Sequence, residues 1–424
     1  MRDRLLGGGG PDLPHLGLGL AGFAAAVAAA TLLIRSPAAS RTVITPSPGR
    51  DRRKTARSPR WTVLPRLSTL ARDELPYPPD VFPGARDVDT PYGNLRVYEW
   101  GPEDAAERVL LLHGIGTPCL ALGGVAGEFV RRGWRVMTFG ELLALSSQKH
   151  VLNAGWADFF GRGYSDAPTD LPYDSRLYTT QILLALASSP LRGWTGDDAF
   201  HLLGYSLGGA VAAAFAASSP HLVRSLTLVA PGGLIRSAAH VGWRSRFLYN
   251  SPLLPEGLRR WVVGRRLAPA KRAGDVPEAE AVDGVEPEEE AGWDELRLVG
   301  GGRIGEVVGW QLAAHEGFVG SYVSTIREAP VYDRADEEWR VLAKVLEARR
   351  EEGDVAGAGL RKGRVLFVLG ERDEIVVPGE TVWDARRVLG EDAVEVLVLK
   401  AGHEVGVTKG EEIVDGVLAA WARE

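Results

Sequence analysis

One serine in this chain stands where its hydroxyl could act as a nucleophile. Ser206 is the centre of a Gly-x-Ser-x-Gly sequence at 204–208, which follows an apolar run at 199–203 and precedes an alanine-rich run at 210–217. A sharp strand-to-helix turn of this kind exposes the central side chain, and the helix N-terminus favours developing negative charge. The pattern therefore indicates attack by a serine hydroxyl. Because the chain contains 52 glycines, the pentapeptide alone also fits a glycine-rich turn whose serine caps a helix.

A second motif favours the catalytic interpretation. The apolar run 108–112 reads as a buried strand and ends in His113-Gly114-Ile115-Gly116. Together with the serine turn, this loop resembles the α/β-hydrolase family. The resemblance implies that the backbone N–H groups of Ile115 and Leu207 form an oxyanion hole, which binds the charge of a tetrahedral intermediate. We interpret His113 as a residue that shapes the loop and takes no part in proton transfer.

A serine hydroxyl needs a base to accept its proton and an acid to orient that base. The family's order of serine, acid and histidine implies Asp373, after the strand 364–369, and His403, after the strand 394–399. His403 is the only histidine after Asp373, and the spacing of 30 positions accommodates one helix and one strand. Glu371 and Glu374 are alternative acids, which we interpret as solvated turn charges.

The alternation of strand-like and helical stretches along the chain predicts an α/β fold with a mostly parallel, doubly wound sheet. Apolar or alternating runs separated by helical stretches predict the strands 94–100, 108–112, 134–139, 199–203, 225–230, 364–369 and 394–399. The proposed acid, base and nucleophile all follow strand C-termini, where such sheets bind ligands. We expect the α/β-hydrolase core to comprise 89–231 and 363–424.

The interval between the serine and the acid is longer than one strand–helix unit requires. We expect residues 232–362 to form a helical lid insertion over the site. Within it, 275–295 contains ten acidic residues and no basic one, which predicts a solvated and disordered loop. The aromatic and aliphatic run 243–254 is predicted to form the lid's core, with some side chains facing an acyl chain.

The N-terminal region is expected to be a leader (1–34) followed by a basic linker rich in Pro and Ser (35–88). Residues 16–34 contain no charge and are long enough to cross a bilayer as a helix. Because most of the positive charge follows this segment, we predict a single-pass membrane anchor with the catalytic domain in the cytosol. A mitochondrial presequence and a cleaved secretory signal are the alternatives.

Residues 140–157 interrupt a junction that the family makes directly. The strand 134–139 and the turn at 158–166, which resembles the family's Asp-x-x-Gly-x-Gly-x-Ser turn, are separated by eighteen residues, or 54 nucleotides. The codons for Gly140 and Glu141 can contain GT, and those for Ala157 and Asp158 can contain AG. Removal of the nucleotides from this GT to this AG would join Phe to Asp in frame. We interpret the segment as a retained intron; a true loop insertion beside the site is the alternative.

These features predict a serine hydrolase that cleaves carboxylic esters of a hydrophobic substrate through an acyl-enzyme. A carbon–carbon bond hydrolase or an aminopeptidase on the same fold is one alternative, because specificity lies in the lid. A non-catalytic binding protein that keeps the fold is another. The single cysteine, Cys119, excludes a disulfide framework, and no metal or organic cofactor is implied. Nucleic acid is not an expected partner, and the sequence leaves the oligomeric state and the acyl-chain length open.

Overall fold

A computed structural model describes residues 54–79, 85–138, 158–269, 293–353 and 359–422. The predicted anchor at 16–34 and the segment 140–157 lie outside the described residues, as does most of the acidic run 275–295. None of the helices in the described ranges combines the length and apolar character that crossing a membrane requires.

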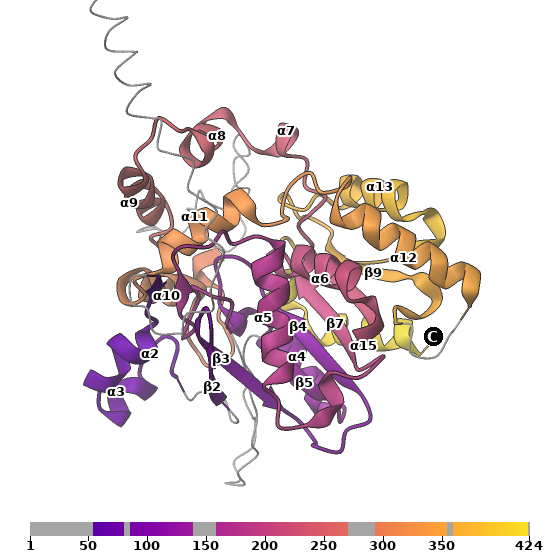
Figure 1. Cartoon of the computed structure of the whole chain (residues 1–424), viewed down its shortest axis with the longest axis horizontal. Helices are drawn as coiled ribbons and strands as arrows, with labels where there is room; N and C mark the ends of the chain where they lie inside the picture. Colours follow the sequence, from indigo (N-terminus) through magenta and orange to yellow (C-terminus); the bar gives the residue numbers. More distant parts are fainter. Residues whose placement is uncertain (1–53, 80–84, 139–157, 270–292, 354–358, 423–424) are drawn as a thin grey trace, which may run out of the picture. The chain divides into compact units, whose positions relative to one another are not determined.

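An eight-stranded sheet forms the centre of the domain (Figure 1). Its strands lie in the order β10-β9-β8-β7-β4-β5-β3-β2. The five pairs from β10 to β5 are parallel, and β3 pairs antiparallel with both β5 and β2. The predicted mostly parallel sheet is therefore confirmed. The sheet strands are β2 (Ala85–Thr90), β3 (Gly93–Trp100), β4 (Arg108–Leu112), β5 (Arg135–Thr138), β7 (Phe200–Tyr205), β8 (Val223–Val229), β9 (Val365–Gly370) and β10 (Val394–Leu399).

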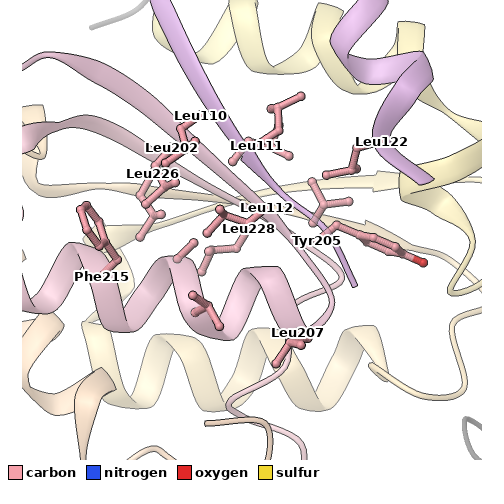
Figure 2. Packing of buried hydrophobic residues seen from close by; sticks show 14 of the residues in the cluster. Leu110, Leu111, Leu112, Leu122, Leu202, Tyr205, Leu207, Phe215, Leu226 and Leu228 are labelled. Atoms are coloured by element: carbon pink, nitrogen blue, oxygen red, sulfur yellow. The ribbon is translucent and has the colours of Figure 1, made fainter. Parts of the chain in front are cut away.

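Two helical layers enclose this sheet, as the doubly wound pattern predicts. One layer contains α4 (Gly123–Arg131), α14 (Val405–Thr408) and α15 (Gly410–Trp421), which contact one another. The other contains α5 (Ser175–Ala187), α6 (Leu207–Ser218), α12 (Glu338–Glu352) and α13 (Pro378–Leu389). Figure 2 shows leucines of β4, β7 and β8 lying beside one another and facing α6. Strands buried on both faces read as continuous apolar runs, which made them visible in the sequence.

A further group of helices lies in the chain between β8 and β9. It comprises α7 (Ser237–His240), α8 (Trp243–Asn250), α9 (Glu256–Arg266), α10 (Ile304–Ala314) and α11 (Phe318–Glu328). Both α8 and α9 pack on α11 (Figure 1), around a second apolar cluster that includes Leu248, Val263 and Phe318. The last helix of the interval, α12, instead packs on α6 and α13 and so covers the sheet.

The structure differs from the expected linker at 35–88. Its described part contains β1 (Thr55–Ala56), α2 (Pro59–Thr62), α3 (Thr69–Asp73) and the edge strand β2. β1 pairs with β6 (Ala167–Pro168), and the Asp166 carboxylate accepts a hydrogen bond from the backbone N–H of Ser58 at 2.8 Å. Pro, Ser and Arg suggested a loop. The elements are too short to show periodicity, and long-range pairing stabilises them.

Candidate active site

Ser206 occupies the turn between β7 and α6 in a strained conformation. Its φ of 54° and ψ of −119° lie in a region that side chains other than glycine rarely adopt. A Cβ on Gly204 would lie 2.1 Å from the Gly208 carbonyl oxygen, and one on Gly208 would lie 2.2 Å from that of Leu112. Both glycines are therefore required by close backbone approach. The turn is held by the Ser206 carbonyl, which accepts from the N–H groups of Gly209 and Gly232 at 2.9 and 3.0 Å.

The three side chains predicted to act together are hydrogen-bonded in a line. Ser206 Oγ lies 3.0 Å from His403 Nε2, and His403 Nδ1 lies 2.9 Å from Asp373 Oδ2. The second carboxylate oxygen, Oδ1, accepts from the N–H groups of Ile375 and Val376 at 2.9 and 2.8 Å. Because a carboxylate only accepts, Nδ1 carries the imidazole proton and Nε2 is left to accept from the serine hydroxyl. This arrangement can deprotonate Ser206 and return the proton.

The loop after β4 presents the N–H of Ile115, and its orientation follows from the contacts of its neighbours. His113 Nδ1 lies 2.7 Å from the Gly114 carbonyl oxygen, and His113 Nε2 accepts from the Phe159 N–H at 3.1 Å. Nδ1 is thus the donor. In a trans peptide the N–H of Ile115 points opposite to the Gly114 carbonyl, so His113 orients it. Burial lowers the pKa of His113 to about 3, which keeps the ring neutral.

Two further side chains hold the next carbonyls of this loop. Arg162 Nε donates to the Ile115 carbonyl at 2.7 Å, and Gln311 Nε2 donates to the Gly116 carbonyl at 3.4 Å. The Arg162 guanidinium is almost fully buried; it also donates to Ser321 and Thr325 on α11. No carboxylate of the described residues lies within ion-pair distance of it, and burial lowers its pKa.

Sequence reasoning placed Arg162 in a family-like turn but missed this role. Nothing in the linear sequence joins the turn to α11, 159 residues away. The turn at 158–166 is held in place by the buried side chain of Asp158. One carboxylate oxygen of Asp158 accepts from the Tyr77 hydroxyl at 2.9 Å, and the other accepts from Cys119 Sγ at 2.8 Å. Burial raises the pKa of Asp158. Cys119 is therefore a buried structural thiol beneath the loop.

A cavity of about 360 Å³ opens at the serine. Ser206, His403, Ile115 and Leu207 all line it. In the described part of the chain, neither Ile115 N–H nor Leu207 N–H has a protein acceptor, so both can bind an oxygen placed beside Ser206 Oγ. The rest of the lining mixes apolar and polar side chains: Ile235, Ser237, His240, Val241, Ser245, Arg246, Tyr249, Asn250, Tyr322, Ile326, Arg327, Val331, Tyr332 and Ile375.

Most of that lining comes from the helices between β8 and β9, where sequence reasoning expected a lid whose run 243–254 faces an acyl chain, without singling out individual residues. Tyr249 is one such residue. Its side chain is 6% exposed and its hydroxyl has no hydrogen-bond partner within the described chain. Glu371 and Glu374, the alternative acids, make none of the contacts to His403 that Asp373 makes. Among the described residues, no group of three His, Cys, Asp or Glu side chains is arranged to hold a metal ion.

Comparison with known proteins agrees with this architecture. The sequence profile of the α/β hydrolase fold family matches residues 107–409. A search of curated protein sequences finds no match. Similar solved structures include a hydrolase from Pseudomonas aeruginosa (18% identity, 79% of this chain and 97% of that one, TM-score 0.49). They also include naproxen esterase from Bacillus subtilis (16%, 81% and 92%, 0.47) and the thioesterase domain of the curacin biosynthetic pathway (14%, 80% and 99%, 0.46). With its parallel sheet, serine turn and matching profile, this chain belongs to the α/β-hydrolase fold family.

Proposed function

We propose that this protein is a serine hydrolase that cleaves carboxylic esters of a hydrophobic substrate. The observation that carries the proposal is the hydrogen-bonded line Ser206–His403–Asp373 at a cavity where two backbone N–H groups have no acceptor among the described residues.

In the proposed reaction, His403 Nε2 takes the proton of Ser206 as Oγ attacks the ester carbonyl. Asp373 holds the imidazole tautomer and stabilises the imidazolium that forms. The N–H groups of Ile115 and Leu207 bind the oxyanion, and they require no reorganisation because the loop and the helix N-terminus are already held. His403 then protonates the leaving alcohol. Water, activated by the same imidazole, cleaves the acyl-enzyme and restores Ser206.

The cavity lining supports an apolar acyl group. Ile235, Val241, Ile326 and Val331 offer branched aliphatic surface, while polar groups stand among them. We propose that the lid consists of α7 to α11 within the interval 232–362, since α12 lies on the sheet. From sequence alone we also propose that residues 16–34 anchor the chain in a membrane with the catalytic domain in the cytosol; mitochondrial import is the alternative.

Labelling with a fluorophosphonate tests the proposal on the full chain. We expect covalent modification of wild type and none of S206A, and hydrolysis of p-nitrophenyl esters that falls about 10⁴-fold in D373N, where the imidazole is held in the wrong tautomer. A folded wild-type protein that takes no label would refute hydrolysis and favour the binding-protein alternative. Labelling with negligible ester turnover, but rapid cleavage of a dienone or an aminoacyl amide, would favour the carbon–carbon hydrolase or the aminopeptidase.

A further inference from the structure

Exposed apolar side chains gather on α8, on α9 and on the turn between them. Of the eleven large hydrophobic side chains exposed in the described chain, five fall within the nineteen residues 243–261. These five define what we call the α8–α9 surface: Trp243 (74% exposed), Phe247 (49%), Leu253 (67%), Leu258 (47%) and Trp261 (57%). Isolated exposed hydrophobics are ordinary, but five of them on one helix–turn–helix segment indicate an interaction site.

The cluster is not a packing face left without its partner. Each helix already buries another side, since Leu248 of α8 and Val263 of α9 lie in the apolar cluster formed with α11. Arg259 of α9, which is 3% exposed, joins the two helices by donating to the Leu248 carbonyl of α8. It also donates to the carbonyls of Ser251 and Leu254, in the turn, at 2.8 and 3.0 Å. The outward residues are spaced three or four apart, so each helix presents a second apolar stripe to solvent.

The same segment is strongly basic. Residues 243–266 contain six arginines and one glutamate, a net charge of +5 in a chain whose net charge is −6. The Arg244 guanidinium lies over the Trp243 ring at 5.6 Å, and that of Arg265 lies over the Trp261 ring at 4.8 Å. Tryptophan beside arginine on an amphipathic helix is the composition that binds the boundary between lipid headgroups and acyl chains.

Charge distinguishes the possible occupants of this surface. A second copy packed through the same face would bring like charges together, including Arg244 and Arg265 beside the exposed tryptophans, which disfavours a symmetric dimer. An anionic lipid surface satisfies both properties, because its headgroups attract the arginines and its acyl region accepts the aromatic rings. Ser245 and Tyr249 of α8 line the cavity at Ser206. We propose that the α8–α9 surface docks on anionic lipid membranes, which places the mouth of the cavity at the lipid.

This inference goes beyond the proposed function, and its test does not require hydrolysis. The full chain is mixed with vesicles of phosphatidylcholine and phosphatidylglycerol whose acyl chains carry bromine, which quenches tryptophan on contact. We expect quenching of wild type to fall by more than half in the double variant W243F/W261F. The matched control is W383F. Trp383 is a residue of α13, outside the α8–α9 surface; it is 58% exposed, and the guanidinium groups of Arg236 and Arg387 lie over its ring. An N-terminal anchor would bring both proteins to the vesicle equally.

Charge gives a second readout. Each arginine near an anionic surface strengthens binding about fivefold, so the double variant R244Q/R265Q should reduce surface-dependent quenching at limiting lipid by about 25-fold. Equal quenching in wild type and W243F/W261F would overturn the proposal. Self-association of wild type that W243F/W261F abolishes, without vesicle quenching, would also overturn it and assign the surface to a second copy.

Discussion

Replacing Arg162 by methionine tests how the loop at 113–117, which we call the oxyanion loop for its proposed role, is held. The guanidinium donates to the Ile115 carbonyl at 2.7 Å, while its other nitrogens reach α11. Methionine fills much of the same volume but leaves that carbonyl without its donor, so the peptide plane after Ile115 can rotate. Ile115 joins this plane to the one that carries its own N–H, which His113 orients, so the N–H proposed to bind the oxyanion is held less firmly.

Two energies bound the size of the effect on kcat. A hydrogen bond to a charged group contributes about 1.5–3 kcal/mol, and loss of an oxyanion donor costs about 2.7–4 kcal/mol of transition-state stabilisation. Because R162M displaces the donor without deleting it, we expect kcat to fall by roughly 10- to 100-fold with little change in KM. Stability should change much less, since burying an unpaired cation already costs several kcal/mol and offsets the lost hydrogen bonds.

Steady-state kinetics on a soluble p-nitrophenyl ester and urea unfolding of the same preparations measure both quantities. The affinity of a trifluoromethyl ketone, which forms the oxyanion, should fall in parallel with kcat, whereas substrate KM should not. T325V is the matched control: it removes one of the two contacts of Arg162 with α11, that with Thr325 at 3.4 Å, and leaves those with Ser321 and Ile115. An R162M protein with wild-type stability and wild-type kcat would refute the reasoning, as would a T325V protein as impaired as R162M.

Three further outcomes are expected. G208A should lose more than 100-fold in kcat, because its Cβ would lie 2.2 Å from the Leu112 carbonyl oxygen and must displace the loop; G264A on α9, whose Cβ would meet Val319 at 3.5 Å, should remain active. Burial lowers the pKa of His315 to about 4 in the folded protein. As pH falls below 6.5, this histidine is therefore protonated in the unfolded chain while it stays neutral in the folded one. The free energy of unfolding should therefore drop between pH 6.5 and 4 by about 1.4 kcal/mol per pH unit from this residue, a slope that urea titrations should find reduced in H315Q but not in the exposed-site control H221Q. Sequencing of transcripts should recover a message without the 54 nucleotides that encode the interruption at 140–157, and a message that always retains them would contradict the intron interpretation.

Local sequence predicted the parts of this protein whose physics is local. The serine turn was recognisable because Gly204 and Gly208 meet backbone atoms only a few residues away in sequence or on the adjoining strand end. The central strands were recognisable because burial on both faces leaves continuous apolar runs. Asp373 and His403 were predicted from the family's order of residues. The sheet brings these two residues to Ser206, because β7, β9 and β10 run parallel and their C-terminal ends lie at the same end of the sheet.

Tertiary structure alone decided the features that depend on contacts between distant segments. The short elements at 54–79 read as linker because their stabilising partners lie near Asp166, more than one hundred residues along the chain. Arginine is usually exposed, so the sequence gives no sign that Arg162 is buried; the fold places its charge between the oxyanion loop and α11. The two faces of α8, one lining the cavity and one carrying Trp243 to solvent, likewise depend on how that helix packs. Periodicity specifies that a helix has faces; the packing of its neighbours determines which face is covered.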